Sequence, residues 1–130
     1  MTRYLLDSTV LIRRLRGEED VLQRLLRLVD EGHEIGTSCV NIAEIERGAR
    51  PGHRRRAASF MGRLEFFATT REAAERAGRY QATFAGRGRT IHTADALVAG
   101  TARAHGAVLV TDDLDDFPMR DLRVISPAAM

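Results

Sequence analysis

The sequence predicts a three-layer α/β/α fold with a mainly parallel sheet of four or five strands. Short apolar runs alternate with longer segments whose apolar residues recur at helical spacing. Glycine, in one place next to proline, lies at several of the junctions between them. Strands that alternate with helices pair in parallel through right-handed crossovers. The 130 residues suffice for one domain of this kind, which we expect to span residues 1–130.

The apolar runs give candidate strands at residues 3–7, 34–37, 66–69, 107–111 and 123–126. The fourth run, AVLVT, is apolar at nearly every position, which is typical of a strand buried on both faces. The first run ends at Asp7 and the fourth at Thr111. We therefore expect polar side chains just beyond two of the strands.

Helical spacing gives candidate helices at residues 9–15, 18–31, 38–47, 53–65, 71–85 and 93–105. We expect Ser8 and Ser38 to cap the first and third of these helices. Gly32 and Gly106 are placed to end the second and the sixth. The last helix, TADALVAGTARAH, carries small apolar residues on nearly every side, which predicts burial nearly all round.

Composition restricts the class of protein. Apolar content of 44% and charged content of 29% are ordinary for a folded chain. The single cysteine, Cys39, excludes an internal disulfide and favours a reducing compartment. No apolar run approaches the roughly 18 residues of a membrane helix, and Asp7 interrupts the short apolar stretch at the N-terminus. We expect a cytoplasmic protein with no membrane association.

The basic residues are all arginine, 20 of them, and the net charge is only +2. A chain without lysine cannot form the P-loop of an NTPase, which needs its motif lysine. Receiver-like signalling domains and haloacid-dehalogenase-like phosphatases normally need a lysine as well. Arginine binds phosphate in a bidentate manner, so phosphate-rich partners remain open.

Four carboxylates occupy positions that a parallel sheet would bring together. Asp7 ends the first strand, and Asp113 follows the fourth within the run TDDLDDF. Glu44 lies in the helix after the second strand, and Asp95 lies in the first turn of the small-residue helix. Ligands of open α/β sheets bind at the carboxyl ends of the strands. We therefore expect these acids to line one pocket.

Each acid also has a plain structural explanation. Asp7 is placed to cap the next helix, and Asp95 is placed to complement the dipole of its own helix. Glu44 would be a solvated helix residue, and the run from Asp112 to Asp116 a solvated loop. The four explanations are less convincing together, because all the acids fall where one sheet edge gathers them.

Clustered carboxylates repel one another unless a cation neutralises them. Oxygen-only ligands select a hard ion such as Mg²⁺ or Mn²⁺. Such an ion lowers the pKa of bound water and polarises a phosphoryl oxygen, which is the chemistry of phosphodiester hydrolysis. The four histidines lack the paired spacing of a zinc site.

Three segments resemble the successive motifs of PIN-domain nucleases: YLLDSTVLI, NIAEIERGA and HTADALVAGTARAHGAVLVTDDLDDF. The resemblance extends from Tyr4 to Ile125 and is strongest to the VapC toxins of bacterial toxin–antitoxin pairs. It implies a Mg²⁺- or Mn²⁺-dependent endoribonuclease. Many members of the family read Asp-Thr-Asn where this chain has Asp7-Ser8-Thr9, so the asparagine amide of that motif is missing here.

The resemblance also assigns roles. Asp7, Asp95 and Asp113 would hold the metal ion, and Glu44 would complete the catalytic pocket. Thr111 would orient a carboxylate or the attacking water. Either Asp115 or Asp116 could supplement Asp113. Beyond the resemblance, Arg87 and Arg89 lie beside a glycine hinge, and we expect them to contact the phosphates of the RNA substrate.

The implied partners are RNA, a cognate small antitoxin and a second copy of the chain. We expect the helices at 9–15 and 18–31 to expose apolar residues, including some of Leu11, Ile12 and Leu15, as a groove for a partner helix; core packing or a homodimer seam is the alternative. A partner arginine would be attracted to the acidic pocket. A catalytically inactive PIN-like binding module is the alternative function, which the intact acids disfavour. Cleavage of DNA rather than RNA remains open.

Overall fold

The computed structural model describes residues 1–130 and contains one five-stranded parallel sheet. The strand order is β3-β2-β1-β4-β5. The strands are β1 (Arg3–Leu6), β2 (Glu34–Thr37), β3 (Glu65–Phe66), β4 (Ala107–Val110) and β5 (Val124–Ile125). All five predicted strands are present, and the predicted fold class is confirmed.

The helices agree with the sequence prediction to within a few residues. They are α1 (Ser8–Leu15), α2 (Glu19–Asp30), α3 (Cys39–Gly48), α4 (Arg54–Met61), α5 (Arg71–Ala85) and α6 (Thr93–Ala104). Ser38 caps α3 by accepting a hydrogen bond from the backbone of Asn41, as expected. The prediction that Ser8 caps α1 is wrong, because Asp7 occupies that position and Ser8 begins the helix.

The segment around β3 departs most from the prediction. The helix expected to reach residue 65 ends at Met61, and the strand begins at Glu65 rather than at Phe66. β3 is a two-residue edge strand whose side chains are both exposed, so no alternation of apolar and polar residues marks it.

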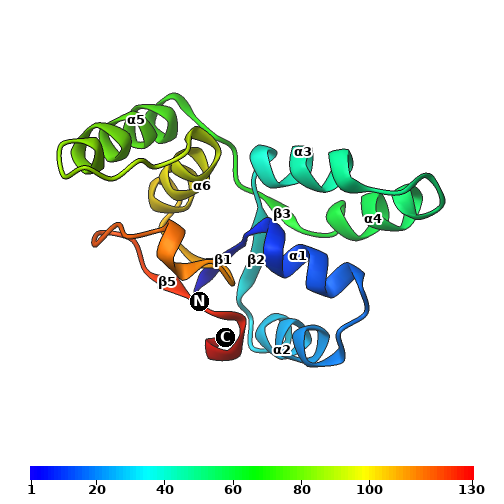
Figure 1. Ribbon diagram of the computed structural model, residues 1–130. Coiled ribbons are helices and arrows are strands. Elements are labelled where there is room, and N and C mark those ends of the chain that lie inside the picture. The colour runs from blue at the N-terminus through cyan, green and yellow to red at the C-terminus, as the bar shows by residue number, and fades with distance from the viewer.

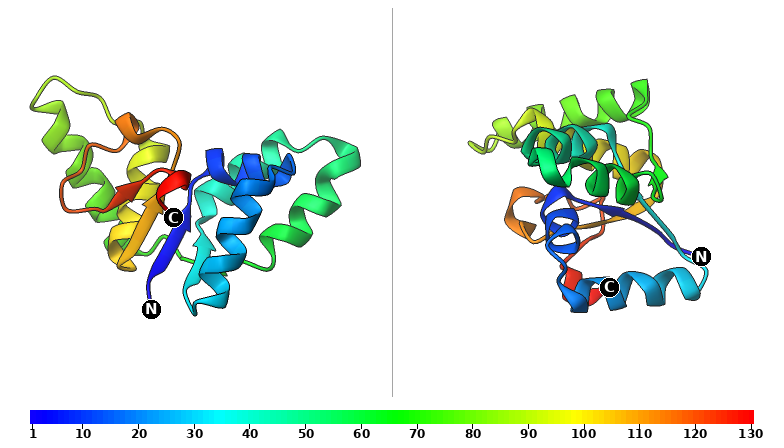
Figure 2. Two further views of the ribbon diagram at one scale, coloured as in Figure 1. Left: turned by 90° about the horizontal axis from the view of Figure 1, so that it is seen from below. Right: turned by 90° about the vertical axis from the view of Figure 1, so that its right-hand side faces the viewer.

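Two apolar cores lie on opposite faces of the sheet. Neighbouring residues of β1 divide between them, with Leu5 in the core beneath α5 and α6 and Leu6 in the core beneath α1 and α2. The view from below shows β1 running between the α5–α6 pair and the group formed by α1 to α4 (Figure 2). Because both faces are covered, β4 is buried at all of its positions, as its sequence predicted.

The chain changes direction across the sheet between β1 and β4 (Figure 1). From β1 it proceeds outwards through β2 to β3, and then it crosses to the other side of β1 to form β4 and β5. Such a switch point leaves a crevice at the carboxyl ends of the two central strands. Asp7 follows β1 and Thr111 follows β4, so both lie at this crevice.

The expected apolar surface is only partly correct. Of the three candidates on α1, Leu11 is fully buried in the core, so it cannot contact a partner. Leu11 faces inward because α1 packs directly against α2 and the sheet, whereas Ile12, Leu26 and Val29 stay exposed. None of the helices is both long enough and apolar enough to span a membrane.

Candidate active site

Asp7 is a buried carboxylate held by side chains from two distant segments. It occupies the N-cap position of α1, yet its side chain makes no capping hydrogen bond. Instead, its Oδ1 accepts a hydrogen bond from Nδ2 of Asn41 at 3.0 Å, and its Oδ2 accepts one from Oγ1 of Thr111 at 2.8 Å. Only 7% of Asp7 is exposed. The side chain is therefore positioned by the site and not by the helix end.

Burial raises the pKa of Asp7 above its usual value of 3.8, and burial is the largest influence on it. The hydrogen bonds from Thr111 and Asn41 act in the opposite direction, because they stabilise the charged form. The negative charge of Glu44 adds to the increase. A nearby cation would favour the charged form of Asp7 and lower its pKa.

Glu44 lies half-buried on α3 and is linked to Asp7 through two polar side chains. Oγ of Ser8 donates to Oε1 of Glu44 at 2.8 Å, and Nδ2 of Asn41 donates to that same Ser8 oxygen at 3.0 Å. Glu46, the other acid of α3, is exposed and pairs with Arg54. Two residues along a helix correspond to a rotation of about 200°, which separates the two acids.

Asn41 is the part of the site that sequence reasoning missed. It is fully buried, and Ser38 donates a hydrogen bond to its carbonyl oxygen at 2.6 Å, which directs the amide nitrogen at Asp7 and Ser8. It thereby provides a side-chain amide beside Asp7, which the first motif lacks. Its spacing of three residues from Glu44 puts both on one face of α3, and this was the available signal.

Asp95 lies half-buried in the first turn of α6, and its pKa is raised to about 6. Burial is the main cause, followed by the charges of Asp116, Asp7 and Glu44; His92 acts weakly in the opposite direction. A helix N-terminus would by itself favour the charged form. Burial and the surrounding acids together therefore outweigh the dipole, and the charges of four carboxylates act on one another.

Thr111 connects the loop after β4 to Asp7. Its hydroxyl donates to Asp7 and accepts a hydrogen bond from the backbone N–H of Asp113 at 3.0 Å. Asp113 is itself exposed. Within this loop, Asp116 is the acid whose charge acts most strongly on Asp95. The backbone of Asp113 is thus fixed at the site, while Asp116 contributes the larger charge.

The two arginines expected to contact substrate lie outside this hydrogen-bonded network. Both are exposed. Arg89 donates to the backbone carbonyl of Asp115 in the acidic loop. The guanidinium of Arg87 lies over the ring of Phe84, 5.4 Å from its centroid. Arg89 is therefore the one that borders the acids.

The donor set suits a hard divalent cation. The three charges that raise the pKa of Asp95 all belong to carboxylates, whose mutual repulsion a cation would relieve. As the side chains stand, no three acid, histidine or cysteine residues come close enough together to hold an ion. The site therefore offers the chemistry of a Mg²⁺ or Mn²⁺ centre without a preformed coordination shell.

Fold and site together define an α/β/α protein with an oxygen-rich acidic site at the switch point of a parallel sheet. The family model of the PIN domain matches residues 4–121. The chain therefore belongs to the PIN-domain family. It is also 30% identical over 115 residues to a protein named Ribonuclease VapC19 from Mycobacterium tuberculosis, covering 88% of this chain and 92% of that protein.

Solved structures share the fold. VapBC-1 from nontypeable Haemophilus influenzae superposes with a TM-score of 0.84 at 20% identity, covering 98% of this chain and 99% of that one. VapBC from Salmonella typhimurium, solved bound to DNA, gives 0.83 at 24% identity with the same coverage. VapBC2 from Rickettsia felis, bound to a promoter DNA fragment, gives 0.82 at 21% identity, covering 96% and 98%.

Proposed function

We propose that this protein is a VapC-type toxin, a cytoplasmic endoribonuclease that depends on Mg²⁺ or Mn²⁺. The observation that carries the proposal is that Asp7, Glu44, Asp95 and Asp116 lie close enough to interact: burial, and after it the charges of Asp116, Asp7 and Glu44, raises the pKa of Asp95 to about 6. The ribonuclease name of the relative from Mycobacterium tuberculosis supports the reaction. Hydrolysis of a phosphodiester requires charge compensation at such a site.

Asp7 and Asp95 would hold the ion, with Asp113 or Asp116 completing the set. A bound ion supplies an activated water and polarises the phosphoryl oxygen. Asn41 and Thr111 keep Asp7 in one orientation through their hydrogen bonds, so that its lone pairs are presented consistently. Glu44, bonded to Ser8, is available to accept a hydrogen bond from a water at the scissile phosphate.

Substitution of the acids tests this proposal. We expect Asp7→Asn and Asp95→Asn each to lower the rate of RNA cleavage by about two orders of magnitude or more, since each removes a proposed ligand. Glu46→Gln is the control, because it also neutralises one acid, but Glu46 is exposed and paired with Arg54 outside the acidic site. Equal activity of all variants in single-turnover cleavage of RNA would refute the assignment.

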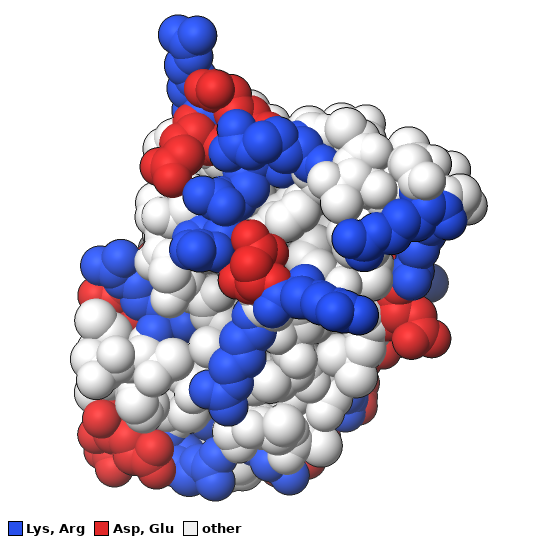
Figure 3. Space-filling view, turned by 90° about the vertical axis from the view of Figure 1, so that its left-hand side faces the viewer, with Lys and Arg blue, Asp and Glu red and all other residues white.

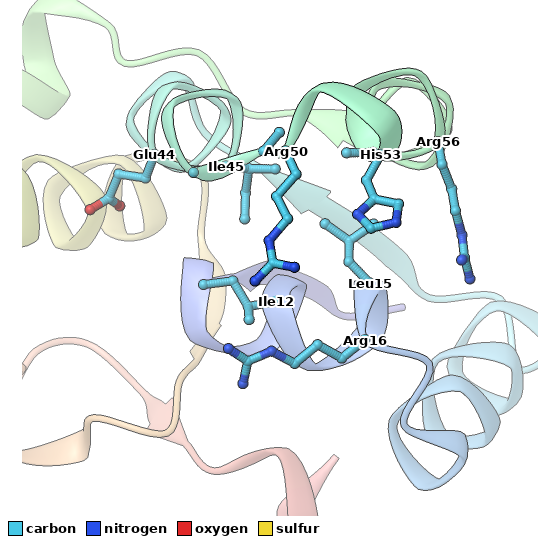
Figure 4. Close-up of a pocket in the computed structure, with 11 residues that line it drawn as sticks. Ile12, Leu15, Arg16, Glu44, Ile45, Arg50, His53 and Arg56 are labelled. Atoms are coloured by element: carbon cyan, nitrogen blue, oxygen red, sulfur yellow. The ribbon is translucent and has the colours of Figure 1, made fainter.

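We also propose a small antitoxin as partner, because the structural relatives are VapBC assemblies. An apolar-floored groove lies between α1 and the α3–α4 segment, where Ile12 and Leu15 face Ile45 (Figure 4). This groove adjoins α3 and α4, not α2 as the sequence had suggested. An amphipathic partner segment would fit it, and an arginine of that partner would suit the acids. The bound partner should inhibit RNA cleavage, and cleavage that persists with excess partner would contradict this proposal.

On family grounds we further propose a homodimer.

A further inference from the structure

Most of the charged surface on the α5 side of the molecule is mixed. Figure 3 shows arginine side chains beside acidic ones over this face. Arg76 and Arg103 both approach Asp121, and Arg71 pairs with Glu75. Such pairs leave little net charge for an outside ligand.

The other end of the molecule is different. Four arginines line a hollow of about 460 Å³ between the end of α1 and α4, together with Gly52, Ser59 and Phe60; they are Arg14, Arg55, Arg56 and Arg63. None of the four forms an ion pair with an acid. Like charges so close together are unfavourable without an anion to compensate them.

Arg14 is held in this hollow in a way that suits a bound anion. Its guanidinium lies over the ring of Phe60, 5.0 Å from the centroid, which restricts its orientation. Its Nε is buried and has no hydrogen-bond partner. A buried donor without a partner costs about 1–3 kcal/mol, and an anionic oxygen would satisfy it.

The hollow is continuous with the groove that leads to the acids. The two share Leu15 and Arg56. Figure 4 shows Glu44 at one end of this groove and Arg56 at the other, with Arg16 and Arg50 approaching from opposite sides between them. Basic side chains therefore extend from the acidic site to the arginine hollow.

We propose that this arginine hollow binds backbone phosphates of the RNA strand at a distance from the bond that is cleaved. The inference rests on the proposed ribonuclease function. The acids that would perform the reaction repel the backbone of their own substrate, so the binding free energy must come from positive charge elsewhere. The unpaired arginines beyond Arg50 and Arg16 provide it, and their planar groups match phosphate oxygens.

A phosphate track is favoured over a site for an acidic peptide by its composition. Only Leu15 and Phe60 are apolar among the eight residues that line the hollow, which leaves little surface for the apolar side chains of a peptide. A nucleic-acid backbone needs only regularly placed positive charge.

The test compares two double variants that remove the same charge. Arg55→Ala/Arg63→Ala empties the hollow of two cations, while Arg71→Ala/Arg79→Ala removes two exposed arginines from α5. Binding of a fluorescent single-stranded RNA of about 20 nucleotides is measured in EDTA, without cleavage, over a range of salt concentrations. We expect the first variant to reduce the slope of log K against log salt by about 1.4, from about 0.7 for each phosphate contact. The second should leave the slope as in the wild type.

Cleavage kinetics with Mg²⁺ provide a second readout. The first variant should raise KM for the long RNA with little change in kcat, because contacts away from the reacting bond contribute uniform binding. Salt slopes that are equal in both variants and the wild type, with thermal unfolding showing both variants folded, would overturn the inference. Weakened binding of an acidic partner peptide with unchanged RNA binding would overturn it too. If the wild type cleaves no RNA, the proposed function is refuted. The inference about the hollow is tested separately, because RNA binding is measured in EDTA and does not depend on cleavage.

Discussion

Asp7 and Asp95 are both acids of the site, but their surroundings affect their charged forms differently. Asp7 accepts two side-chain hydrogen bonds that favour its charged form, whereas for Asp95 only His92 offsets the effects of burial and of its acidic neighbours. Asp95 is thus the acid whose ionisation is most opposed by like charge. A bound cation would therefore stabilise the charged form of Asp95 most. Without the cation, the charge of Asp95 should lower the stability of the folded protein.

Removal of the Asp95 charge should stabilise the metal-free protein at neutral pH. The pKa of Asp95 is about 6 in the folded state against an ordinary 3.8. Between these values the folded state binds more protons than the unfolded chain, so this group lowers stability as pH rises from about 4 to about 6, and the loss persists above that range. We expect Asp95→Asn to have a higher Tm than the wild type in EDTA at pH 7.5, with the difference shrinking towards pH 4.

The control for this measurement is Asp30→Asn. Asp30 is exposed on α2 and forms no ion pair, so its removal should leave the Tm and its pH dependence nearly unchanged. An Asp95→Asn variant that is less stable than the wild type at pH 7.5 in EDTA would show that burial and the neighbouring acids do not disfavour the charged form of Asp95.

Individual site residues could be predicted from the sequence where they lie next to a recognisable strand or helix. Asp7 and Thr111 could be located because they directly follow apolar runs. The spacing of Asn41 from Glu44 indicates a shared face of α3, but the contacts that give Asn41 and Ser8 their roles join segments more than 30 residues apart and could not be predicted. The larger influence of Asp116 compared with Asp113 depends on how the acidic loop turns, which its uniform composition does not reveal.

The packing of α5 against α6 determines where Asp95 lies. The two helices approach closely at Gly100, where an added Cβ would lie 2.3 Å from the carbonyl oxygen of Ala73 and 3.2 Å from the backbone nitrogen of Ala77. Backbone atoms cannot move aside as a flexible side chain can. A side chain at this position must therefore push the helices apart.

We expect Gly100→Ala to lower the free energy of unfolding by about 1–3 kcal/mol, as overpacking commonly does. Gly78, in the middle of α5, has nothing within 4 Å of its added Cβ, so Gly78→Ala is the matched control. It should stabilise the protein by about 0.5–1 kcal/mol, because glycine is unfavourable inside a helix. Urea unfolding measures both, and equal effects of the two substitutions would contradict the close approach at Gly100.

Elements with a strong apolar period were predictable, and those without one were not. The small residues of α6 predicted its burial, and its bounds agree to within a residue. The sequence could not show that α5 is its packing partner. β3 was misplaced because both of its side chains are exposed.

For the whole molecule, the parallel sheet followed from the alternation of strands and helices, but the strand order did not. The crossing from β3 to β4 across β1 creates the crevice and thus brings the first and last thirds of the chain together at Asp7 and Thr111. The groove beside α1 likewise depends on how α3 and α4 return over it. These features arise from tertiary packing, which local patterns do not encode.

The central claim is that the acids at this crevice act through a divalent metal ion. RNA cleavage by the purified wild-type protein, first stripped with EDTA and dialysed and then supplied with Mg²⁺ or Mn²⁺, tests it most directly. We expect no cleavage by the stripped protein and recovery on addition of either ion, since the uncompensated carboxylates cannot approach a phosphodiester without a cation. Full cleavage in the continued presence of EDTA would contradict the account.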